Sequence, residues 1–141
     1  MRYCLSAIAV SAVTVACGGG LEPNAPILAG FSYTETPAGA GEVPYDSVAT
    51  AARNILVAHK ATGNLCGSRL TAGVTSSASE VRLNVFQSPI ATCSSAAKIV
   101  SYSGTIQINA GTYHLVVVET NGGFPQGKVV IDQTVVVPAT D

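Results

Sequence analysis

The chain is 141 residues long, which suffices for one domain around a single hydrophobic core but not for two. Charged residues make up only 11% of it, against a usual share of about 25%, and the formal net charge is −1. The seven basic residues are scattered rather than clustered, which argues against nucleic acid as a partner. Ser, Thr, Asn and Gly carry the polar share instead, as in many extracytoplasmic β-proteins.

The N-terminus has the layout of a signal peptide. Residues 1–3 contain one positive charge, Arg2, and residues 4–15 are apolar or small throughout. An apolar run of this length matches the central region of a signal peptide and is too short to span a bilayer. It leads into residues 13–17, Val-Thr-Val-Ala-Cys, which three glycines follow.

This stretch resembles the lipobox of bacterial lipoproteins, in which the cysteine is diacylated and becomes the mature N-terminus. Ala16 supplies the small residue that the signal peptidase needs, whereas Thr14 replaces the usual Leu. The resemblance implies a signal peptide over residues 1–16 and an acylated Cys17 that anchors the protein to a lipid bilayer, since two or three acyl chains hold a protein on a membrane. Gly18 in place of Asp implies the outer membrane if the cell is Gram-negative. The alternative is an ordinary secretory signal that is cleaved at another position.

The other cysteines predict a disulfide. Cys4 would leave with the signal peptide, and Cys17 would be lipidated. Cys66 and Cys93 then remain as an even pair in an oxidising compartment, where a disulfide is expected. The two cysteines are 27 positions apart (93 − 66). A disulfide that closes a loop of this length stabilises the fold by ~3–4 kcal/mol in the chain-entropy model. A redox or metal role is the alternative, but the sequence has no CxxC motif.

Residues 17–26 are predicted to be a flexible tether, because three glycines and two prolines leave nothing that can pack. The domain itself is predicted to occupy residues 27–141. Its first strand is predicted over residues 27–36, with Phe31 and Tyr33 on one face.

Residues 46–62 fit two structures. Asp46 and Ser47 can cap a helix that ends at Gly63, with apolar residues at helical spacing in between. Residues 53–60 instead contain a β-branched cluster of strand length. We favour a strand over residues 53–60, because every later element is predicted to be a strand.

Alternation of apolar and polar residues predicts most of the later strands. The residues that share an apolar face are Cys66, Ser68, Leu70, Ala72 and Val74; then Val81, Leu83 and Val85; then Val100, Tyr102, Ile106 and Ile108. Gly104 is predicted to be a bulge or a site of close approach. A last strand covers residues 129–137. If Val129, Ile131 and Val135 point inward, Val130 and Val136 lie on its outer side.

The clearest strand is residues 111–119, where a glycine and a tyrosine precede an unbroken run of strand formers. Its core face consists of Tyr113, Leu115 and Val117. Val116 and Val118 on the other face are apolar too, so that face needs a cover. We expect residues 27–60 to lie across it. The alternative is a partner or a second copy of the chain, for which Val116 and Val118 are candidate binding residues.

Seven short strands separated mostly by turns indicate an all-β fold, an antiparallel β-sandwich. Residues 111–113, Gly-Thr-Tyr, resemble the start of the penultimate strand in immunoglobulin-like and fibronectin type III-like domains of bacterial surface proteins. The resemblance covers about residues 66–137 and implies a tyrosine corner, in which the Tyr113 hydroxyl bonds the backbone of the preceding loop. The chain differs from antibody domains, because it has no Trp and no cysteine on the Tyr113 strand. The disulfide therefore differs from the inter-sheet disulfide of those domains. Because Cys66 begins one predicted strand and Cys93 lies in a loop, it would staple one end of the sandwich.

Groups suited to catalysis are few. His114 and Glu119 point to opposite faces of their strand, whereas His114 and Asp132 become neighbours if their strands pair. No residues have the spacing of a zinc site, and the motifs of nucleotide-binding proteins and hydrolases do not occur. We therefore expect no enzyme, no metal and no cofactor.

Phe124 is a candidate aromatic anchor for a partner if it is exposed, and a cap on the core if it folds back. We expect a non-catalytic binding or envelope-structural module that is displayed from a membrane and that binds an unidentified protein or itself. The alternative is a small-ligand carrier or an accessory subunit of an envelope enzyme complex. A sandwich of this size normally fills its interior with side chains, which counts against a carrier.

Overall fold

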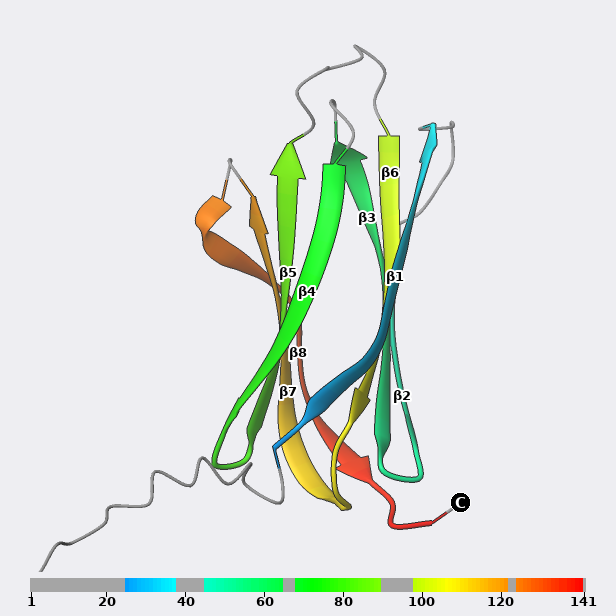
Figure 1. Ribbon diagram of the computed structural model, residues 1–141, viewed down its shortest axis with the longest axis vertical. Helices are drawn as coiled ribbons and strands as arrows, with labels where there is room; N and C mark the ends of the chain where they lie inside the picture. The colour runs from blue at the N-terminus through cyan, green and yellow to red at the C-terminus, as the bar shows by residue number, and fades with distance from the viewer. Residues whose placement is uncertain (1–24, 38–44, 65–67, 90–97, 122–123, 141) are drawn as a thin grey trace, which may run out of the picture.

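A computed structural model of the chain describes residues 25–37, 45–64, 68–89, 98–121 and 124–140. These residues form an all-β fold of two four-stranded sheets that face each other (Figure 1). The strands are β1 (Ile27–Pro37), β2 (Tyr45–Ala51), β3 (Asn54–Asn64), β4 (Ser68–Ser77), β5 (Glu80–Pro89), β6 (Lys98–Gln107), β7 (Gly111–Asn121) and β8 (Phe124–Val137). A helix of the length and hydropathy needed to cross a membrane is not found in this part of the chain.

The directions of the strands depart from a purely antiparallel arrangement at one pair. Sheet A has the order β1-β6-β3-β2, and sheet B has the order β4-β5-β7-β8. All neighbouring strands are antiparallel except β5 and β7, which pair in parallel in the middle of sheet B. The prediction of an antiparallel sandwich is therefore wrong at this pair. Because β6 crosses to sheet A between them, β5 and β7 run in the same direction.

Residues 46–62 belong to two strands rather than to a helix, so the prediction of a strand over residues 53–60 is confirmed. The additional strand is β2, which raises the number from the predicted seven to eight. A tight turn joins it to β3, with Arg53 at a φ of 56° and the Asn54 side chain donating to the Ala52 carbonyl oxygen at 2.7 Å. Only Val48 of this edge strand is a hydrophobic residue packed against the core, which explains its weak apolar pattern.

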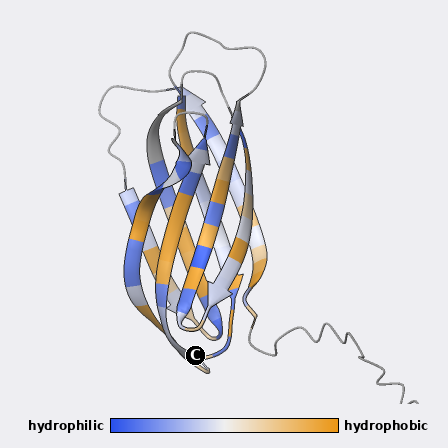
Figure 2. Ribbon diagram, turned by 90° about the vertical axis from the view of Figure 1, so that its left-hand side faces the viewer, coloured by the Kyte–Doolittle hydropathy of each residue, from blue (hydrophilic) through white to orange (hydrophobic). Residues whose placement is uncertain are grey.

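The core lies between the sheets and follows the predicted alternation, visible as changes of colour along the strands in Figure 2. Its fully buried side chains are Ile55, Val57, Val81, Leu83, Val85, Ile106, Leu115, Val117 and Val137. Gly104 is a site of close approach, because a Cβ there would lie 3.4 Å from Leu83 Cδ2. A methyl group here would thus already touch the end of the Leu83 side chain, and a larger side chain would have to displace it.

The sandwich has two ends, which are defined by the direction of β1 and at which different residues lie. At the proximal end, where β1 begins, lie Ile27, Ala51, Glu80, Gly111 and Val137. At the distal end, where β1 ends, lie Pro37, Tyr45, Ser68 and Asn121. Backbone bonds join several strands at the proximal end: the Arg53 N–H donates to the Pro138 carbonyl oxygen at 3.0 Å, and the Ile108 N–H donates to the Arg53 carbonyl oxygen at 2.9 Å.

The cover of the outer face of β7 is not the one predicted. The strands within residues 27–60 belong to sheet A, which packs against the inner face of sheet B, so the prediction that they lie across Val116 and Val118 is wrong. The start of β8 covers Val118 instead, because Gly127 passes so close that a Cβ there would lie 2.6 Å from Val118 Cγ1. Gly127 also has a φ of 82°, which favours glycine. Val116 and Val118 are only 4% and 7% exposed, so they offer little surface to a partner.

A register shift changes which valines of β8 face the core. The strand pairing is irregular between Val117 and Val118, and Val118 faces Val129 across the pair. Val129 is 51% exposed, whereas Val130 packs against the core. The prediction that Val129 points inward and Val130 outward is therefore wrong, because the register shift reverses the alternation at this point. Val136 is exposed, and Ile131 and Val135 are buried, as expected.

Candidate functional site

Several predicted site residues lie outside the part of the chain that the structure describes. These are Cys17, Cys66 and Cys93. Phe124 begins β8, but the surroundings of its side chain are likewise not described. The lipidation, the disulfide and the aromatic anchor therefore stay predictions.

Tyr113 makes the contact that the sequence predicts for it. Its hydroxyl donates to the Asn109 carbonyl oxygen at 3.1 Å, across the connection between β6 and β7. The ring also lies over Gly111, where an added Cβ would be 3.2 Å from the ring and the hydroxyl. The Gly-Thr-Tyr sequence thus provides both the hydroxyl and the space that the ring needs.

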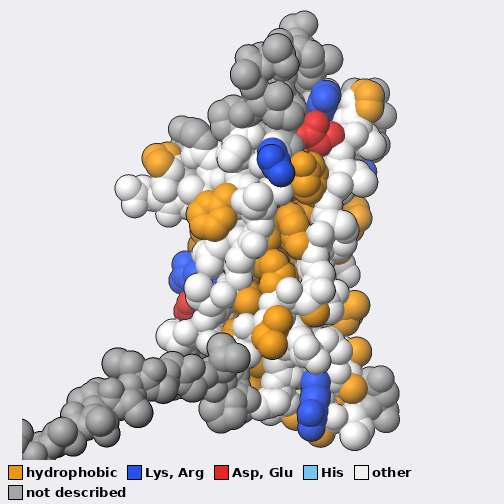
Figure 3. Space-filling model, viewed as in Figure 1, with side chains coloured by type: hydrophobic (Ala, Val, Ile, Leu, Met, Phe, Trp, Pro, Cys, Tyr) orange, Lys and Arg blue, Asp and Glu red, His pale blue; other side chains and the backbone are white. Residues whose placement is uncertain are grey.

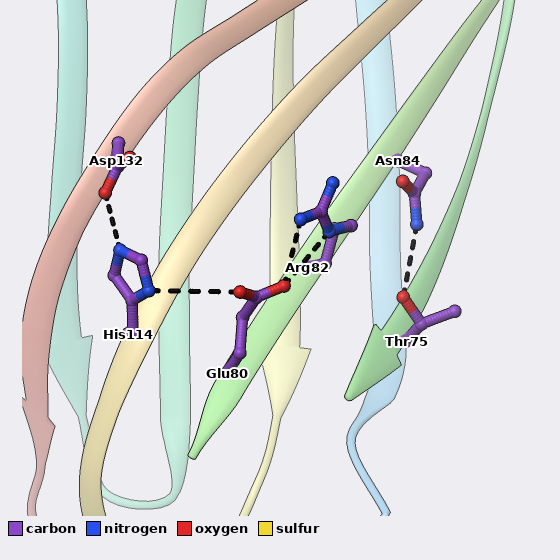
Figure 4. Close-up of polar contacts among 6 residues, drawn as sticks. All are labelled: Thr75, Glu80, Arg82, Asn84, His114 and Asp132. Atoms are coloured by element: carbon purple, nitrogen blue, oxygen red, sulfur yellow. Dashed lines mark hydrogen bonds and ion pairs between the residues drawn. The ribbon is translucent and has the colours of Figure 1, made fainter. Parts of the chain in front are cut away.

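The first polar cluster lies on the outer face of sheet B and is centred on His114 (Figure 4). His114 Nε2 is 2.5 Å from Asp132 Oδ1, and its Nδ1 is 3.9 Å from Glu80 Oε2. Arg82 donates to the same Glu80 carboxylate from Nε and Nη2, each at 3.1 Å. Asp132 of β8, His114 of β7 and Glu80 and Arg82 of β5 thus form one row across three strands, as sequence reasoning predicted for Asp132 and His114. We call these four residues the surface cluster.

The surface cluster has the geometry of a screened ion-pair network. The His114 and Asp132 side chains are 45% and 60% exposed. The two carboxylates approach opposite nitrogens of the ring, so they do not converge on one point. Among the described residues, no group of three or more His, Cys, Asp or Glu is arranged to hold a metal ion.

The second polar cluster lies between the sheets, near the distal end, and is centred on His59. His59 is only 8% exposed and is the one buried polar residue of the described core. Its Nδ1 pairs with Asp46 Oδ1, and its Nε2 lies 3.2 Å from Glu119 Oε1. The Tyr102 hydroxyl donates to the same Glu119 oxygen at 3.0 Å. The Asp46 side chain lies at the rim of this group and is 50% exposed. We call Asp46, His59, Tyr102 and Glu119 the buried cluster, after its central ring.

The strand register brings the buried cluster together from both sheets. In sheet A, His59 of β3 stands between Asp46 of β2 and Tyr102 of β6, and the centroids of its ring and the Tyr102 ring lie 5.2 Å apart. Glu119 belongs to β7 of sheet B. It continues the inward face of Leu115 and Val117, and it reaches sheet A because alternation points it there. A single carboxylate therefore links the two sheets.

Burial and the neighbouring charges have opposite effects on the pKa values of His59 and Glu119. Burial lowers the pKa of His59, but the hydrogen bonds that the ring donates to Glu119 and Asp46, together with the negative charges of these carboxylates, outweigh it and leave that pKa raised above its ordinary value. Burial likewise raises the pKa of Glu119, and the His59 and Tyr102 hydrogen bonds outweigh it and leave that pKa lowered. The pKa of Tyr102 is raised, mainly by burial, so its hydroxyl keeps its proton and remains a donor. The cluster is thus built around a charged imidazole between two carboxylates.

In this arrangement both nitrogens of the His59 imidazole are engaged in contacts within the protein. A general base needs a free nitrogen lone pair facing the substrate. Both ring nitrogens of His59 face carboxylates instead, and the ring is buried. Sequence reasoning missed the cluster because its four residues come from four strands, although the inward position of Glu119 was readable from the alternation of β7.

An apolar seam marks the edge of the sandwich between β1 and β4. Figure 3 shows a column of hydrophobic side chains between the two sheets at this edge. Leu28 and Phe31 of β1 and Ala72 and Val74 of β4 are partly buried there and pack against the core. Tyr33, on the same strand as Phe31, is 37% exposed.

Comparison with known proteins leaves the site to be interpreted from its own residues. The chain matches no family model, no curated protein and no solved structure.

Proposed function

We propose that this protein is a membrane-anchored, extracytoplasmic lipoprotein that displays a non-catalytic binding or envelope-structural module of the immunoglobulin-like class. The observation that carries the proposal is the lipobox-like stretch that ends at Cys17, followed by glycines and prolines, with the first strand starting at Ile27. Such a stretch would be lipidated, and the residues after it would tether the domain to the bilayer.

The proposed anchor would have a definite orientation relative to the domain. β1 begins at the proximal end, so a tether that leads into Ile27 holds that end toward the membrane. The distal end, with Tyr45 and the buried cluster nearby, then faces away. A binding module presents its contact surface on the side that a partner can reach.

Two features support a module of the immunoglobulin-like class. The two facing sheets provide the layers of such a sandwich, and the Tyr113 hydrogen bond to Asn109 corresponds to a tyrosine corner. Domains of this class share the architecture without always sharing the strand order. The parallel β5–β7 pair makes this chain a variant in strand order.

Two further features support binding rather than catalysis. Each histidine already faces two carboxylates: His59 in the buried cluster and His114 in the surface cluster. The apolar seam and the exposed Phe86, which is 48% exposed on β5, leave hydrophobic surface for a partner.

The anchor is tested by mass spectrometry of the mature N-terminus and by membrane fractionation. We expect a diacylated Cys17 as the first residue and a Cys17→Ala variant that leaves the membrane fraction. Cys4→Ser is the matched control, because it lies in the part that would be removed, and it should behave like the wild type. An unmodified Cys17, or cleavage at another position, would refute the lipid anchor.

The binding role is tested by crosslinking in intact cells with the tagged full-length chain. A binding module should yield a defined crosslinked species, either with itself or with one envelope protein. A small molecule that stays with the chain in native mass spectrometry would favour a carrier instead.

A further inference from the structure

We propose that the buried cluster is a pH-sensitive latch, which holds sheet A to sheet B at the distal end when His59 is protonated and releases that end when the proton is lost. This proposal rests on the geometry of the sandwich and is independent of the lipid anchor. It concerns a conformational device rather than a binding site.

The contacts that make the latch cross the gap between the sheets. Glu119 is carried by sheet B, whereas His59 and Tyr102, which both contact its Oε1 atom, are carried by sheet A. The corresponding bonds at the proximal end are of another kind, because they join backbone groups of Arg53, Ile108 and Pro138. Backbone hydrogen bonds do not titrate near neutral pH, so within the described ranges the contacts whose charge depends on pH join the sheets at the distal end.

Every element around His59 contributes a group that acts on its proton. β2 contributes Asp46 and β7 contributes Glu119, both acceptors for the charged ring. β6 contributes Tyr102, which donates to Glu119 and keeps its own proton. β8 contributes Lys128, whose positive charge stabilises the ionised Glu119. With His59 charged, the centre of the latch is one positive ring between two negative groups.

Loss of the proton reverses this balance. A neutral imidazole can donate from one nitrogen only, so it can no longer donate to both Asp46 and Glu119. Asp46 can be hydrated where it stands, because its side chain is 50% exposed. The Glu119 side chain is only 19% exposed, so its negative charge then stays between the sheets without a positive partner on the ring, which is costly. Opening the distal end returns Glu119 to water. The raised pKa of His59 means that the latch is complete below the ordinary value of 6.5 and is released as the pH rises through the raised value.

The surface cluster provides a matched control. His114 also stands between an Asp and a Glu, but its side chain is 45% exposed and its partners lie on the same sheet. Both of its carboxylates are in contact with water and belong to one sheet, so this cluster cannot hold one sheet to the other.

The test is amide hydrogen exchange on the full-length chain in detergent, across a series of pH values and corrected for the intrinsic exchange rate. As the pH rises through the titration of His59, we expect protection at the distal parts of β3 and β7 to fall by about tenfold for each unit that separates the pKa values of the closed and open states. Protection near Ile55 and Leu115 should change by less than about twofold. Equal loss at both ends, or no loss at either end, would overturn the proposal.

Two variants and one direct titration complete the test. His59→Gln should show low distal protection at every pH, without a step, whereas His114→Gln should keep the step of the wild type. A step that survives in His59→Gln would refute the latch. If His59→Gln does not fold, the His59 ring in the wild type is titrated by NMR: a ring that titrates at another pH than the loss of distal protection refutes the latch as well.

Discussion

The two histidines of this protein stand in nearly the same chemical setting and have different consequences. Each ring lies between one aspartate and one glutamate. The His59 side chain is 10% exposed and its partners come from both sheets, whereas the His114 side chain is 45% exposed and its partners share one sheet. Burial therefore decides whether such a group is a structural element or a screened surface network.

The largest difference is expected when one carboxylate of each cluster is removed. Glu119→Ala leaves His59 buried with one nitrogen unpaired, and we expect the free energy of unfolding to fall by ~3 kcal/mol or more. Glu80→Ala, its matched control, should cost less than ~1 kcal/mol, because the partners of Glu80 remain hydrated. Urea unfolding near pH 6 measures both variants. Equal losses would remove the distinction between the two clusters.

The tyrosine hydroxyls extend the comparison to neutral donors. Tyr102→Phe removes the donor to a buried carboxylate, and we expect a loss of ~1.5–2 kcal/mol. Tyr113→Phe removes a bond to a backbone carbonyl at an exposed position and should cost ~0.5–1 kcal/mol. Thermal unfolding of the two variants ranks them. A larger loss for Tyr113→Phe would show that the turn before β7 matters more than the buried cluster.

The dependence of stability on pH should show the contribution of the buried cluster more sharply than any single measurement. The raised pKa of His59 makes its contribution complete below 6.5 and lost as the pH rises through the raised value. The lowered pKa of Glu119 makes its contribution complete above 4.5 and lost as the pH falls through the lowered value. The stability difference between the wild type and His59→Gln should therefore be largest between pH 4.5 and 6.5 and shrink on either side. Urea unfolding at several pH values measures it, and a difference that is constant with pH would contradict this account.

The smallest effect concerns salt. Raising NaCl to about 1 M shortens the Debye length to about 3 Å and should abolish the cost of Asp132→Ala, which we expect to be ~0.5 kcal/mol or less in dilute buffer. The cost of Glu119→Ala should persist, because buried pairs are screened much less. Unfolding of both variants at low and high salt is the measurement. A strong salt effect on Glu119→Ala would indicate that water reaches the buried cluster.

Alternation in the sequence predicted the strands that carry the core and little of what connects them. The inward faces of β5, β6 and β7 were readable because each has an apolar residue at every second position, as in Val81, Leu83 and Val85. β2 was missed because an edge strand with one core residue, Val48, has almost no pattern. The parallel β5–β7 pair was missed because the period of a strand carries no information on its direction.

The buried cluster could not be predicted for a related reason. Its residues come from β2, β3, β6 and β7, and only the pairing of those strands places them together. Pairing the last two strands was enough to predict His114 beside Asp132. The place of Val129 depended on a register shift, and the cover of Val118 depended on the path of Gly127, neither of which alternation reveals.

The position of β6 has a consequence for how the domain forms. β1 pairs with β6, and the bond between Ser32 and Ser103 joins residues 71 positions apart. β6 lies in sheet A between β5 and β7 along the chain, so the parallel pair in sheet B also depends on a crossover between the sheets. Pairing over such distances slows folding, because the chain must close long loops before the contacts form. A chain that crosses a membrane with its N-terminus first would therefore expose β1 without its partner until residues 98–107 have followed. The arrival of β6 would then determine when sheet A can form.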